Sequence, residues 1–142
     1  MRRNNFILAN PNWTPVKLHL DPVSGCHVIT RHGAGFVVID GIHVTEPVLI
    51  LPDVIINPWR IVAPMPTATS LCVDDFAEVI ERKPELVVFG AGEIFRFPDR
   101  QILAAFALAR IGFEVMDTPA ACRTYNVLVS EGRRIAAALL IS

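Results

Sequence analysis

Two loops in the C-terminal half of the sequence carry residues that could bind a ligand. The apolar run that ends at Phe89 leads into Gly90-Ala91-Gly92, and the run that ends at Met116 leads into Asp117-Thr118-Pro119. Glycine lets a ligand approach the backbone closely, and the first turn of a helix presents N–H groups and a positive dipole end to an anion. The candidate ligand-binding residues are Gly90, Gly92, Asp117, Thr118, Arg123 and Asn126.

The same residues also have purely structural interpretations. The glycines could only release a strand into a loop, Thr118 could only cap a helix, and Arg123 could only be solvated. Asn126 ends the run Thr124-Tyr125-Asn126, three poor helix formers in the middle of a predicted helix. Such a run indicates side chains that either hold tertiary hydrogen bonds or contact a ligand, and the sequence leaves both readings open.

Motifs for catalysis, cofactors and metals are missing from the sequence. The single G-x-G at Gly90 lacks the third glycine and the immediate helix of a dinucleotide-binding fingerprint. Cys122 stands beside Arg123, which could lower the pKa of its thiol, but all four histidines precede residue 44, and we expect a small buried thiol. No histidine forms a short-spaced pair with another metal-ligating residue. We therefore expect no catalytic residue, no cofactor and no metal.

Helices and strands alternate in the half of the chain that contains these loops. Helices are predicted at about 73–82, 99–111 and 119–131, and strands at 86–89, 113–116 and 134–141. Gly112 is predicted to cap the second helix, and Thr118 to be the N-cap of the third, with Pro119 at its first position. This order favours helices packed on a partly parallel sheet, and strand ends in such a sheet gather ligands at one edge.

Short β-type runs separated by turn residues fill the first half of the chain. The dipeptide Asp40-Gly41 between two of them predicts a hairpin, because a type I′ turn needs positive φ at both central residues. We expect this half to be antiparallel. The predicted strands cover 26–30, 35–39, 42–45, 48–51 and 59–63.

Composition restricts the class of protein. The chain has 142 residues, 52% of them hydrophobic and 19% charged, so it must fold, and its length suits one domain. A net charge of -1 makes nucleic acid an unfavourable partner, and the longest apolar run, 102–109, is too short to span a membrane. Three widely spaced cysteines favour reduced thiols and a cytoplasmic location. A flexible or strand-forming N-terminal arm is favoured over a transit peptide, because Pro11 and Pro15 interrupt any helix there.

Residues 102–109 are apolar on every side of the predicted helix. Such a helix must be covered all round, either by the N-terminal β layer or by a second copy of the chain. We expect the β layer to cover it, which leaves the protein a monomer or a weak homodimer.

Several segments of the C-terminal half resemble the Mth938-like domain family of unknown function. They are Leu86-Val87-Val88-Phe89-Gly90-Ala91-Gly92, Gly112-Phe113-Glu114-Val115-Met116-Asp117-Thr118, Ala121-Cys122-Arg123-Thr124-Tyr125-Asn126-Val127-Leu128 and Glu131-Gly132-Arg133-Arg134-Ile135-Ala136-Ala137-Ala138-Leu139-Leu140. The match is looser in the N-terminal half, where it depends on the hairpin at Asp40-Gly41 and on Trp59-Arg60-Ile61-Val62. The family includes a mitochondrial complex I assembly factor and an adipogenesis-associated protein.

The resemblance implies an α/β fold of three layers, in which a mixed central sheet has helices on one side and a β-rich N-terminal layer on the other. It implies one domain over 1–142, with an arm at 1–22, a mostly β part at 23–66 and an αβαβαβ part at 67–142. It supplies no catalytic residues. Ala91 stands where many relatives are expected to carry a threonine, which removes a hydroxyl that an anion site could use.

We expect a non-catalytic protein that binds another protein or assists assembly, with a protein partner and no nucleic acid. The alternative is a small-molecule or anion-binding protein or an enzyme. Its site would lie at the loops that follow the strands at 86–89 and 113–116.

Overall fold

The computed structural model describes residues 27–141 and contains two sheets. The N-terminal sheet has the order β1-β2-β3, and the central sheet has the order β5-β4-β8-β6-β7. The predicted arm at 1–22 and Cys26 lie outside the described residues. The strands are β1 (Ile29–Gly33), β2 (Phe36–Ile39), β3 (Ile42–Val44), β4 (Val48–Ile50), β5 (Ile55–Ile56), β6 (Leu86–Gly90), β7 (Gly112–Met116) and β8 (Ile135–Leu139).

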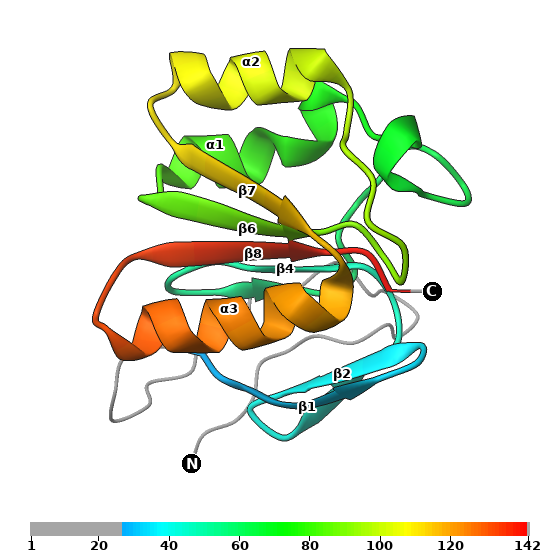
Figure 1. Cartoon of the computed structure of the whole chain (residues 1–142), viewed down its shortest axis with the longest axis vertical. Coiled ribbons are helices and arrows are strands. Elements are labelled where there is room, and N and C mark those ends of the chain that lie inside the picture. Colours follow the sequence, from blue (N-terminus) through cyan, green and yellow to red (C-terminus); the bar gives the residue numbers. More distant parts are fainter. Residues whose placement is uncertain (1–26, 142) are drawn as a thin grey trace, which may run out of the picture.

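The central sheet is mixed, and it separates two layers (Figure 1). Strand β6 pairs in parallel with β7 and β8, while β4 pairs antiparallel with β8 and β5. Helices α1 (Ala77–Arg82) and α2 (Arg100–Leu108) cover one face, and α3 (Thr118–Ser130) lies on the other face with the N-terminal sheet. The predicted three-layer α/β fold is therefore confirmed, with α3 sharing the layer of the N-terminal sheet.

Alternation along the strands divides the interior into two cores. In β8, Ala136 and Ala138 face α1 and α2, whereas Ile135, Ala137 and Leu139 face α3 and the N-terminal sheet. Phe76 lies at the centre of the first core, where its ring makes edge contacts with those of Trp59, Phe89, Phe106 and Phe113. Every residue of β8 is buried, as expected for a strand covered on both faces.

The predicted hairpin at Asp40-Gly41 is confirmed. Both residues have positive φ, 50° and 86°, which is the conformation that a type I′ turn demands. The Asp40 carboxylate also accepts hydrogen bonds from the Val28 N–H and from Nδ1 of His27, at 2.9 and 2.8 Å. The turn and the start of β1 are thereby held together.

Three details of the predicted elements are wrong. Residues 59–63 form no strand: β5 is the two-residue segment before Pro58, and the Trp59 indole instead donates to the Asp75 carbonyl at 2.7 Å. Gly112 begins β7, and Arg110, with φ of 61°, is the left-handed residue after α2. Thr118 is not the N-cap of α3, because Asp117 occupies that position.

The expectation that the N-terminal β layer covers α2 is also wrong. Strands β1 to β3 lie on the far face of the central sheet, and α2 buries only Ile102 and Phe106 fully. Leu108 at its end is 86% exposed. The outer face of α2 is rich in alanine, which is compatible with solvent at little cost, so an apolar composition did not require cover. Within residues 27–141, no helix is long and apolar enough to cross a membrane.

Candidate functional site

The loops after β6 and β7 lie side by side, as their position in a parallel sheet predicts. The Ala91 N–H donates to the Met116 carbonyl at 2.8 Å, and the Thr118 N–H donates to the Gly92 carbonyl at 2.8 Å. The Thr118 hydroxyl accepts from the Gly92 N–H at 2.9 Å and donates to the Leu140 carbonyl at 2.7 Å. Thr118 therefore ties together the segments that follow β6, β7 and β8.

A cavity of about 500 Å³ lies between these loops and the turn from β1 to β2, and we call it the crevice. Its polar lining comes from His32, Glu93 and Thr118, and its apolar lining includes Phe36, Pro119 and Leu140. A volume of this size falls within the range of small-molecule sites. The crevice thus lies directly beside the predicted site.

The start of α3 has no N–H group left for an anion. Thr118 donates to Gly92, Pro119 carries no N–H, and the Ala120 and Ala121 N–H groups donate to the side chain and the carbonyl of Asp117 at 2.8 and 2.9 Å. An anion at a helix N-terminus needs just these groups, and here the Asp117 carboxylate already occupies the positive end. The local geometry therefore favours a structural role for Asp117 and Thr118.

Gly90 and Gly92 serve different purposes in this corner. A Cβ on Gly90 would lie 2.8 Å from the Thr118 hydroxyl oxygen and 3.0 Å from a Leu139 methyl carbon, so Gly90 permits close packing between β6 and α3. Gly92 has φ of 106°, which side chains rarely adopt, and it faces open space at the crevice. Gly92 and Thr118 are the predicted residues that line the crevice.

Asn126 and Arg123 lie away from the crevice. The Asn126 amide holds the backbone of β1, accepting from the Ile29 N–H at 3.0 Å and donating to the Ile29 carbonyl at 2.7 Å. Next to it, the Tyr125 hydroxyl donates to the His27 carbonyl at 3.0 Å. The polar run in the middle of α3 therefore holds tertiary hydrogen bonds, while Arg123 is exposed on that helix.

Cys122 is a buried thiol. Burial raises its pKa from the ordinary 9.0 to about 12, and the neighbouring Arg123 guanidinium only partly opposes this shift. The suggestion that Arg123 lowers the pKa is therefore outweighed by burial, and the thiol carries no charge at neutral pH. Among residues 27–141, no group of three His, Cys, Asp or Glu side chains is placed to hold a metal ion.

An exposed apolar segment lies between β6 and α2, and sequence reasoning missed it. In this aromatic loop (residues 94–97), Ile94 is 65% exposed, Phe95 48% and Phe97 60%. The two rings pack edge to face with their centroids 4.9 Å apart. The signal in the sequence was the cluster Ile94-Phe95-Arg96-Phe97, which stands outside every predicted element.

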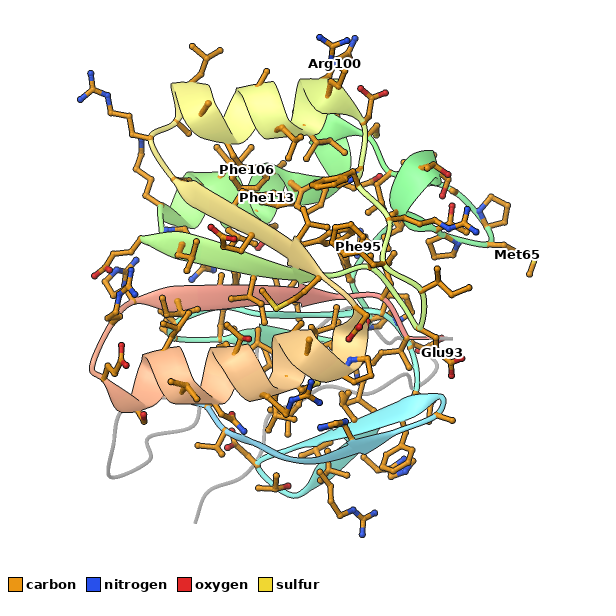
Figure 2. All side chains as sticks on the ribbon, viewed as in Figure 1. Met65, Glu93, Phe95, Arg100, Phe106 and Phe113 are labelled. Atoms are coloured by element: carbon orange, nitrogen blue, oxygen red, sulfur yellow. The ribbon has the colours of Figure 1, made fainter. Side chains whose placement is uncertain are left out.

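The aromatic loop borders a shallow groove of about 300 Å³. Pro66, Thr67 and Ala68 form one wall, and Glu93, Ile94 and Arg96 form another. Beside this groove, Met65 is 82% exposed and points away from the body of the protein (Figure 2). Within the described residues, the guanidinium of Arg96 has no ion-pair partner.

Comparisons with known proteins agree on the family and on the fold. The family described as "Protein of unknown function (DUF498/DUF598)" matches residues 29–140. NADH dehydrogenase (ubiquinone) 1 alpha subcomplex assembly factor 3 from Homo sapiens is 30% identical over 125 residues, which are 87% of this chain and 65% of the human protein. The chain spans 60 to 65% of the length of the human, bovine and rat relatives that it matches.

Solved structures show the same architecture. An NMR structure of a Xanthomonas campestris protein superimposes with a TM-score of 0.71 at 30% identity, covering 81% of this chain and 84% of that one. A Mth938-like domain from Bordetella pertussis superimposes with a TM-score of 0.62 at 24% identity, covering 87% and 91% of the two chains. The resemblance to Mth938-like domains is therefore confirmed.

Proposed function

The chain belongs to the DUF498/DUF598 family of proteins of unknown function, and from that premise we propose that it acts without catalysis, by binding another protein during assembly of a larger complex. The human relative is named as an assembly factor for NADH dehydrogenase. We therefore propose a respiratory complex as the class of client. We propose the cytoplasm as the location, because the free thiols of Cys72 and Cys122 are typical of a reducing compartment.

The aromatic loop is the observation that carries this proposal. Exposed apolar side chains that gather on one surface mark interaction sites, and aromatic residues supply much of the binding energy at protein interfaces. Phe95 and Phe97 already pack on each other, so little side-chain freedom is lost when a partner covers them. The rings of Phe95 and Phe97 belong to neither of the two hydrophobic cores.

The test is affinity capture of the tagged, full-length protein from its own cells, with quantitative mass spectrometry. Phe95→Ser combined with Phe97→Ser should reduce recovery of the partner by about tenfold or more, as loss of aromatic anchors does at interfaces. Leu108→Ser is the matched control, since Leu108 is 86% exposed and ends α2 far from its first turn. Equal recovery with the double variant, or no partner above the untagged control, would refute the proposal.

The crevice supports a second candidate, a small-molecule site that includes Gly92 and Thr118 and borders on Gly90 and Asp117. Its cavity volume favours it, and the satisfied start of α3 favours a neutral or cationic ligand over an anion. Arg123 and Asn126 would contribute only indirectly, through α3. A thermal-shift panel of polyols, nucleosides and amines, with nucleotides, phosphosugars and carboxylates as the anionic comparison, tests it, because a ligand at a hundredfold excess over Kd stabilises by about 2.7 kcal/mol. A panel without any shift would dismiss this candidate.

A further inference from the structure

Strand β7 lies at the edge of the central sheet as residues 27–141 form it. Its Gly112 N–H donates to the Glu85 carbonyl at 3.0 Å, and its Met116 carbonyl accepts from the Ala91 N–H at 2.8 Å. The direction of backbone groups alternates along a strand, so Gly112, Glu114 and Met116 face β6. Phe113 and Val115 then direct two N–H and two carbonyl groups outward, and within residues 27–141 no strand pairs with that side.

The two faces of this edge differ in chemistry. Phe113 and Val115 are half-buried on the α2 face, where the Phe113 ring stacks on that of Phe106 with centroids 4.6 Å apart. Glu114 is exposed on the opposite face, the one that carries α3. An incoming strand would therefore meet Phe113 and Val115 on one face, and the Glu114 carboxylate with half-buried Met116 on the other.

Natural proteins usually protect such an edge with charged side chains, proline, a bulge or a covering element. Strand β7 has one charged residue, Glu114, and no proline, and its pairing with β6 runs in register over all five positions. The aromatic loop follows the C-terminal end of β6, and the Ala91 N–H in that connection donates to the carbonyl of Met116, the last residue of β7. The connection that carries the aromatic loop therefore begins beside the C-terminal end of β7.

We infer that β7 accepts an extended segment of the protein partner as a sixth strand of the central sheet, with a lysine or arginine opposite Glu114 and apolar residues beside Phe113 and Val115. This inference rests on the proposed function and names the mode and chemistry of that binding. The outward backbone groups supply the hydrogen bonds of strand addition, and the alternating side chains supply the specificity. Opposite charges across two strands stabilise the pair, which is why a basic residue matches Glu114.

A second copy of the chain is a poor occupant of the same edge. Antiparallel pairing of two β7 strands about their centre sets Glu114 opposite Glu114, because that residue is the middle one of the five. Like charges directly opposite each other destabilise a strand pair. The carboxylate thereby disfavours the centred register of self-pairing and favours a basic partner strand.

The experiment uses the full-length protein and a disulfide-closed hairpin peptide whose outer strand reads Thr-Val-Lys-Val-Thr. Hydrogen exchange of single amides is followed by NMR. In the free protein, the Phe113 and Val115 amides should exchange rapidly, and saturating hairpin should slow them by about tenfold or more, as new strand pairing does. The Gly112 and Glu114 amides, which face β6, are internal controls and should change little.

Charge reversal tests the partner's chemistry. Glu114→Lys should weaken binding of the hairpin by roughly fivefold to tenfold, and a hairpin with Glu in place of Lys should restore it. Glu131→Lys, at an exposed position at the end of α3, is the matched control and should leave binding unchanged. Val115→Pro removes one outward donor, which an edge strand tolerates, and should abolish binding while the circular-dichroism spectrum stays native.

Three results would overturn the inference. If the Phe113 and Val115 amides exchanged slowly in the free protein at every concentration, the chain's own residues would cover the edge. If their exchange slowed only as the protein concentration rose, a second copy would cover it. If the hairpin left the exchange rates unchanged while a partner was still captured through the aromatic loop, strand addition would be wrong and the proposed function would stand. If the hairpin bound but affinity capture recovered no partner, the proposed function would be wrong instead.

Discussion

The crevice and the edge formed by β7 with the aromatic loop lie at neighbouring parts of the same sheet, but their polar and apolar groups are used in opposite ways. At the crevice, the Thr118 hydroxyl and the first N–H groups of α3 all have partners inside the protein. At the edge, backbone groups of Phe113 and Val115 and the rings of Phe95 and Phe97 have surplus binding capacity. Polar side chains at the crevice are thus used by the fold, whereas the groups that the fold does not use lie at the edge and in the aromatic loop, where we propose recognition.

The largest expected contrast concerns the two described cysteines. Because burial raises the pKa of Cys122 to about 12, its thiolate fraction at pH 8 should be roughly a thousandfold below that of an ordinary thiol. Alkylation in a Cys26→Ser background should therefore modify exposed Cys72 quickly and Cys122 only after unfolding. Mass spectrometry with and without guanidinium measures the two rates of alkylation. Equal rates for Cys72 and Cys122 in the native protein would show that Cys122 is not shielded from the reagent.

The same shift has a consequence for stability. The folded state holds the Cys122 proton more tightly than the unfolded chain does. The resulting contribution to the free energy of unfolding is therefore complete below pH 9 and is lost as the pH rises toward 12. Cys122→Ala should flatten that alkaline decline in the free energy of unfolding.

Thr118→Val tests how firmly the crevice is tied together. The valine keeps the shape but leaves the Gly92 N–H and the Leu140 carbonyl without their partner, which should cost about 2–4 kcal/mol of unfolding free energy. Thr124→Val on the same helix is the control, since Thr124 is half-buried, and it should cost less than about 0.5 kcal/mol. Urea denaturation measures both, and equal midpoints would mean that Thr118 is free to bind a ligand.

Asp117 gives a smaller effect of the same kind. Asp117→Ala removes the side chain that caps α3 and should lower the free energy of unfolding by about 1 kcal/mol, whereas Asp117→Asn keeps a capping oxygen and should cost only a few tenths. Thermal unfolding followed by circular dichroism distinguishes the two variants. A more stable Asp117→Ala protein would instead indicate a carboxylate held under strain for binding.

The aromatic loop should show the smallest effect on stability. Phe97→Ser removes a ring that is 60% exposed, so the free energy of unfolding should change by less than about 1 kcal/mol. Phe106→Ser offers the comparison, because that ring is buried and its loss should cost at least about 3 kcal/mol. If both variants were equally destabilised in urea, the loop would belong to the core and the contrast with the crevice would fail.

Much of the fold could be predicted from local patterns. The hairpin at Asp40-Gly41 and the order of helices and strands after residue 73 followed from turn chemistry and from hydrophobic periodicity. The strand predicted at 59–63 failed because its N–H groups do not bond one neighbouring strand: the Trp59 N–H donates to the Pro47 carbonyl and the Val62 N–H to the Asp75 carboxylate. The assignment of Thr118 as a cap failed because its hydroxyl donates instead to the carbonyl of Leu140, 22 residues further along the chain.

The candidate site was harder to predict than the fold. Adjacent loops after β6 and β7 follow from parallel pairing alone, so the neighbourhood of Gly90, Gly92, Asp117 and Thr118 was within reach. That Asn126 holds Ile29, 97 residues away, was not. The aromatic loop was missed because a segment without periodicity carries no prediction of what it packs against.

Periodicity, turn residues and composition were enough to establish one mixed α/β fold and to place two loops at one edge of its sheet, because these depend on contacts between residues close in the chain or on the rules of strand pairing. Which polar groups were satisfied, and which strand and rings stayed open, depended on pairs of residues tens of positions apart. Only the packed structure settles such pairs, since a hydrogen bond forms where geometry allows, whatever the residue type suggests. For this protein, that packing gave Thr118 partners inside the fold and left the edge strand and the aromatic loop as the surface on which we propose recognition.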